Sequence, residues 1–90
     1  MPKFVIERRL PGAGELTREE LHAIWSRCNQ VVAELQGRAQ WLHSYVTSDK
    51  LYCVYVAVDA DAVREHAEIG GFPVDVISEV RTVADPVNGE

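Results

Sequence analysis

The chain has 90 residues, of which 47% are hydrophobic and 26% are charged, and its 14 acidic and 9 basic residues give a net charge of −5. This composition is ample for one folded core and excludes an intrinsically disordered chain. Arg8-Arg9 is the only adjacent basic pair, and an acidic surface without a basic run repels phosphates, so nucleic-acid binding is not expected.

The first half of the chain predicts a strand, a loop and a long helix. Residues 3–9, KFVIERR, alternate in part and form the strand, and residues 10–14, LPGAG, form the loop. Thr17 and Glu20 match a capping box. Apolar side chains then recur at helical spacing: Leu21, Ile24, Cys28, Val31, Val32 and Leu35. We expect this helix of about 18 residues to end near residues 36–37, with glycine as its C-terminal cap.

The second half predicts a hairpin, a shorter helix and a last strand. Residues 40–47 and 51–58 are strands rich in aromatic and β-branched residues, joined by a turn over TSDK. Asp59 is suited to cap a helix over 60–69, which Gly70-Gly71 ends. Residues 74–83 alternate as a strand, and residues 84–90 are polar and expected to be loose.

This order of elements predicts an α+β, ferredoxin-like βαββαβ fold. It has one four-stranded antiparallel sheet with two helices on one face, in a single domain over residues 1–90, ordered from about residue 2 to about 85. The other face of such a sheet is uncovered. A 90-residue sheet with one uncovered face gains stability from a partner, so we expect a homodimer of the dimeric α+β barrel type.

The ends of the chain and its cysteines predict a cytoplasmic protein. The start, MPKFVIERRL, lacks the long apolar run of a signal peptide, and no apolar stretch approaches a membrane span. Cys28 and Cys53 are then expected to be reduced thiols. They do not form a C-x-x-C pair, which excludes a zinc ribbon or a thioredoxin motif.

The hairpin register decides which polar side chains share a face. A two-residue loop pairs Ser44 with Cys53 and Tyr45 with Tyr52. A longer loop or a bulge instead places His43 on the face of Cys53. Alternation within the first hairpin strand puts Trp41, His43 and Tyr45 together in either case. The sequence leaves these two registers open.

Several single residues have both a structural and a functional interpretation. His66 lies on the inner stripe of the second helix. It is either a structural histidine bonded to a backbone carbonyl, or a functional one that acts as a metal ligand or general base. Cys53 is a small buried hydrophobe or a thiolate ligand. Glu7 needs a partner in a central strand, from Arg81, Arg9 or a metal ion.

Other notable residues are expected to be structural. Cys28 belongs to the apolar stripe of the first helix, and His22 near its start has no expected role. The tyrosines 45, 52 and 55 fit cross-strand packing, and Trp25 and Trp41 fit a layer or dimer boundary. No dinucleotide-binding, P-loop, zinc-protease or serine-triad motif is present.

Five short blocks carry a resemblance to a known family: FVIER at 4–8, SYVTSDKLYCVY at 44–55, VREHA at 63–67, GFP at 71–73 and SEV at 78–80. Over about residues 2 to 86 the chain resembles a family of small, largely actinobacterial, ferredoxin-like proteins, formerly of unknown function and often described as nickel-binding. The resemblance implies dimerisation through the sheets and a bound nickel ion or another divalent transition metal. It implies no established reaction.

Three functions follow as hypotheses. The first is a homodimeric nickel-binding protein for buffering or delivery, with His43, Cys53, His66, Glu7 and Tyr45 as candidate ligands. The second is a dimeric α+β barrel enzyme, a small oxygenase or isomerase, with His66 as general base and Tyr45 or Tyr55 as hydrogen-bond donor. A pocket of a few hundred cubic ångströms beside His66 favours this enzyme, and an interior filled by side chains counts against it. The third is an interaction module without chemistry.

Overall fold

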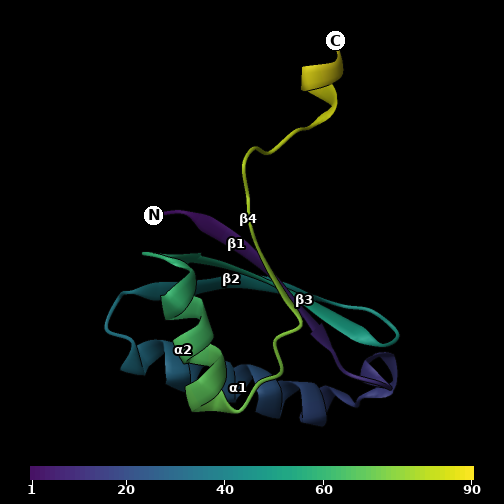
Figure 1. Cartoon of the computed structure of the whole chain (residues 1–90). Helices are drawn as coiled ribbons and strands as arrows, with labels where there is room; N and C mark the ends of the chain where they lie inside the picture. Colours follow the sequence, from purple (N-terminus) through teal and green to yellow (C-terminus); the bar gives the residue numbers. More distant parts are fainter.

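The computed structural model describes all 90 residues, Met1–Glu90, and contains the main elements in the predicted order (Figure 1). The strands are β1 (Lys3–Arg9), β2 (Ala39–Val46), β3 (Lys50–Ala57) and β4 (Val76–Glu79). The helices are α1 (Arg18–Glu34) and α2 (Ala60–Gly70), with short 3-10 turns η1 (Ala13–Glu15) and η2 (Pro86–Gly89). The strands pair antiparallel in the order β2-β3-β1-β4, which confirms the ferredoxin-like α+β fold.

The two helices cover the same face of the sheet, which we call the inner face (Figure 1). Alternation in β1 directs Phe4, Ile6 and Arg8 to this face, where all three are buried, and leaves Val5 and Glu7 half-buried on the opposite, outer face. Buried side chains of β1, β3, α1 and α2 form the core between sheet and helices. No helix is long and apolar enough to cross a membrane.

Local signals set the helix ends. The capping box at the start of α1 is confirmed, because the Glu20 backbone N–H donates to the Thr17 hydroxyl and the Thr17 N–H donates to the Glu20 carboxylate. The Asp59 cap of α2 is also present. However, α1 ends at Glu34, slightly earlier than predicted, because both Gln36 and Gly37 adopt a left-handed conformation with φ of 52° and 85°.

The β2–β3 hairpin has the first of the two registers that the sequence left open, and His43 does not share a face with Cys53. Next to the turn, Ser44 pairs with Cys53 and Tyr45 with Tyr52, as a two-residue loop requires. A bulge between Trp41 and His43 then shifts the pairing, so that Trp41 lies opposite Tyr55. The prediction that Trp41 and His43 share a face was therefore wrong. The bulge turns Trp41 to the inner face.

The last strand is shorter than predicted, with four residues, 76–79, instead of 74–83. Strand β4 pairs only with β1, and β1 begins at Lys3, whose carbonyl accepts the last bond of this ladder from the Val80 N–H. Beyond Val80 the chain has no neighbouring strand and runs away from the sheet and helices (Figure 1). The terminal segment 84–90, which we predict to be loose, contains the short capped turn η2.

Candidate functional site

The five predicted ligands lie on two faces of the sheet. His43, Tyr45 and Glu7 are on the outer face, whereas Cys53 and His66 are buried between the sheet and the helices. The sheet itself separates the two sets, so the five cannot form one site within one chain. No group of three or more His, Cys, Asp or Glu side chains is close enough to hold a metal ion.

On the outer face, the His43 imidazole is exposed and contacts the Tyr45 ring edge to face, with 5.1 Å between the centroids. Tyr52 lies opposite both Tyr45 on β2 and Glu7 on β1, so these three side chains form a row across the sheet. Glu7 finds its charge partner in Lys50, at 3.6 Å, and not in the predicted Arg81 or Arg9. This face therefore carries one imidazole, one carboxylate and two phenols, of which the His43 and Tyr45 side chains are exposed.

On the inner face, His66 is fully buried and bonded as its structural interpretation predicted. Its Nε2 lies 3.3 Å from the Cys28 carbonyl oxygen, which accepts the imidazole N–H, and 3.5 Å from the Cys28 sulfur. The other nitrogen, Nδ1, is buried without a hydrogen-bond partner. Burial lowers the pKa of His66 to about 4, so the imidazole is neutral.

Two neighbours of His66, Cys28 and Tyr55, are also uncharged. The Tyr55 hydroxyl lies 3.2 Å from the Cys28 sulfur, which adds a hydrogen bond to the core position predicted for Cys28. Burial is the main cause that raises the pKa of Cys28, and burial followed by contact with Cys28 raises the pKa of Tyr55. Both groups keep their protons at neutral pH. The inner cluster thus presents a thiol, a phenol and a neutral imidazole, not a set of anionic ligands.

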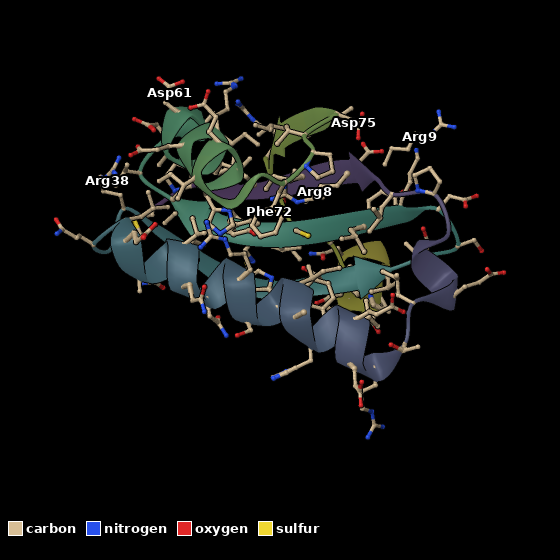
Figure 2. The ribbon with its side chains drawn as sticks, turned by 90° about the horizontal axis from the view of Figure 1, so that it is seen from below. Arg8, Arg9, Arg38, Asp61, Phe72 and Asp75 are labelled. Atoms are coloured by element: carbon tan, nitrogen blue, oxygen red, sulfur yellow. The ribbon has the colours of Figure 1, made fainter.

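Sequence reasoning missed the one charge in this cluster, Arg8. Its side chain is only 2% exposed, donates to the Pro73 carbonyl at 2.7 Å and lies 3.5 Å from the Tyr55 hydroxyl. The guanidinium also lies over the Phe72 ring, 5.3 Å from its centroid, and Figure 2 shows the two side chains together between sheet and helices. The signal was available, since Arg8 follows Phe4 and Ile6 at the spacing of the buried face.

The interior beside His66 is filled by side chains. The imidazole stacks on Phe72 and meets Tyr55 edge to face, with centroids 5.5 and 5.0 Å apart. The one cavity lined by this cluster has room for about one water molecule, with about 10 Å³ for its centre. A pocket of a few hundred cubic ångströms here would have favoured the enzymatic hypothesis, and the filled interior counts against it. The largest surface hollow runs along α1 and contains none of the predicted ligands.

The comparisons with known proteins that give a match agree on one family. The model of the family described as "Nickel responsive protein SCO4226-like" matches residues 4–80. The crystal structure of SCO4226 from Streptomyces coelicolor A3(2) is similar to this chain, with a TM-score of 0.77 and 25% sequence identity, over 91% of this chain and 99% of that one. No curated protein matches the sequence. The resemblance noted in the sequence is confirmed in its family and its fold.

Proposed function

The chain belongs to the family of nickel responsive, SCO4226-like proteins, and from this premise we propose that it binds nickel, or another divalent transition-metal ion, as a homodimer. The observation that carries the proposal is the exposed His43 imidazole, with Tyr45 against it and Glu7 on the same face. Imidazole nitrogen and carboxylate or phenol oxygen are suitable ligands for such ions.

The outer face suits a dication better than the inner cluster does. The inner cluster contains the permanent positive charge of Arg8, which repels a metal ion. Its Cys28 thiol is held protonated, while a metal requires the thiolate. His66 already uses Nε2 toward the Cys28 carbonyl. We therefore propose His43, Glu7 and Tyr45 as the ligands, in place of all five residues predicted from the sequence. Cys53 and His66 are left as structural residues.

A second copy of the chain is the natural source of the missing ligands. One chain offers one imidazole on this face, which is too few for a closed coordination shell. A twofold axis through the sheet face would add the same three side chains from the partner. The face is also partly apolar, since the half-buried Val5 and Tyr52 and the exposed Val76 lie on it. Burial of these side chains would favour a dimer with the two sheets face to face.

Titration calorimetry with Ni²⁺, Zn²⁺, Co²⁺ and Mg²⁺, combined with the mass in solution, tests this function. We expect Ni²⁺ to bind a dimer with a dissociation constant below about 100 μM. We expect His43→Ala to weaken binding at least about tenfold. His22→Ala is the matched control, because His22 is also exposed but lies on α1, away from the sheet face. Absence of transition-metal binding in this range contradicts the proposal and leaves the interaction module.

The finer role, buffering or delivery of the ion, depends on affinity and exchange. A shell of nitrogen and oxygen ligands at an exposed interface gives modest affinity and rapid release, which suits delivery more than long-term storage. Transfer of Ni²⁺ to a competing chelator within seconds supports delivery. Release over hours instead contradicts a delivery role.

A further inference from the structure

The carboxylate of the outer face is already paired with a cation of the chain itself. The Lys50 Nζ lies 3.6 Å from the Glu7 Oε1, and the Glu7 side chain is 32% exposed. Glu7 lies opposite Tyr52 in the β1–β3 pair, and Lys50 is two residues before Tyr52 on the same face of β3. Such diagonal neighbours are within reach of long side chains. The strand register thus brings the ammonium and the carboxylate together.

Lys50 is the only cation that contacts Glu7. The residues directly opposite Glu7 are Tyr52 on β3 and Val76 on β4, and both are uncharged. Neither of the other two ion pairs of the chain includes Glu7 or Arg9, the next residue of β1 on this face. The only other lysine, Lys3, lies opposite Val56, four residues along β1 from Glu7. Lys50 therefore provides the counter-charge of Glu7 in the metal-free chain.

We propose that Lys50 is a built-in competitor of the metal ion: it occupies Glu7 in the metal-free chain and is displaced when the ion binds. This inference rests on the proposed function, because it takes Glu7 as a metal ligand. A carboxylate that coordinates a dication does not also hold an ammonium group closely, since the two cations repel each other. Binding of the ion therefore breaks the Lys50–Glu7 pair, which lowers the affinity and favours rapid release.

Titration of Lys50→Met with Ni²⁺ tests the competition. Loss of the ammonium is expected to tighten binding about threefold to fivefold, which is the size expected for one exposed ion pair. Lys3→Met is the matched control, because it removes the same charge from the same face without touching Glu7. The control is expected to change the affinity less than about twofold, since water and salt screen distant charges. Equal gains in the two lysine variants reflect net charge alone and overturn the proposal.

The same comparison in the Glu7→Gln background isolates the carboxylate. The gain from Lys50→Met is expected to fall below about twofold there, because no carboxylate remains to compete for. An equal gain in both backgrounds overturns the proposal. An Ni²⁺ affinity that Glu7→Gln leaves unchanged also overturns it, but retains the proposed nickel site at His43. Absence of Ni²⁺ binding by the native chain contradicts the proposed function itself, and the competitor with it.

Nuclear magnetic resonance of the native chain tests the displacement without any variant. The chain has only two lysines, so the signals of the Lys50 side chain are readily assigned. We expect a nuclear Overhauser contact between the Lys50 ε-methylene and the Glu7 γ-methylene protons in the metal-free chain. Addition of diamagnetic Zn²⁺ is expected to remove it. A contact that persists in the Zn²⁺-bound chain, or that is absent before the metal is added, overturns the proposal.

Discussion

Acidification is expected to destabilise the fold through His66. In the folded chain its pKa is lowered to about 4 by burial, against an ordinary value of 6.5. Below pH 6.5 the His66 imidazole is protonated in the unfolded chain, whereas in the folded chain it stays neutral down to about pH 4. The stabilisation is therefore complete above pH 6.5 and is lost as the pH falls toward 4. The free energy of unfolding falls by about 3 kcal/mol in total, and about 2 kcal/mol of this is lost between pH 7 and pH 5.

Urea unfolding at a series of pH values between 7.5 and 5 measures this loss. The His66→Gln variant, whose amide N–H is able to donate to the Cys28 carbonyl, is expected to lose about 2 kcal/mol less than the native chain over this range. His22→Gln is the control and is expected to retain the native pH dependence, because His22 is exposed. Parallel pH profiles for the native chain and His66→Gln would refute the assignment of a buried, neutral imidazole.

Four other substitutions, one of them a control, test the local structure by chemical denaturation. Thr17→Ala removes one half of the capping box and is expected to cost about 1 kcal/mol. Gly14→Ala places a Cβ atom 3.0 Å from the backbone of the β2–β3 turn and is expected to cost roughly 1–2 kcal/mol, whereas Gly89→Ala, which meets nothing within 4 Å, stays within about 0.5 kcal/mol. Tyr55→Phe removes the hydroxyl that contacts the Cys28 sulfur, with a cost of about 1–2 kcal/mol and an unchanged Ni²⁺ affinity. A weaker Ni²⁺ affinity in Tyr55→Phe would contradict the separation of the two faces.

The fold was predictable because its signals are local. The Thr17–Glu20 box and the Asp59 cap each act within four residues, and helical periodicity needs only the segment itself. The length of β4 was not predictable in this way, because residues 74–83 alternate well throughout. A strand exists only where a neighbour accepts its hydrogen bonds, and β1 provides that neighbour for about half of the segment.

The candidate site was only partly predictable, because it depends on which face each side chain takes. The inner position of His66 followed from helical spacing, whereas its carbonyl partner was one of two interpretations that the sequence left open. The separation of His43 from Cys53 depended on the hairpin register, which long-range pairing sets. Arg8 was overlooked because arginine is seldom fully buried, although its spacing from Ile6 placed it on the buried face.

The bulge in β2 also determines how sequences of related chains should be aligned. Trp41 stacks on Trp25 in the core, at 5.5 Å between ring centroids, while His43, two positions later, faces out. Leu42 is the extra residue between them, so a relative without it retains both orientations with adjacent Trp and His. A deletion between His43 and the turn would instead exchange the faces of every residue before it. Alignment gaps in this strand therefore separate relatives that present the imidazole outward from those that bury it.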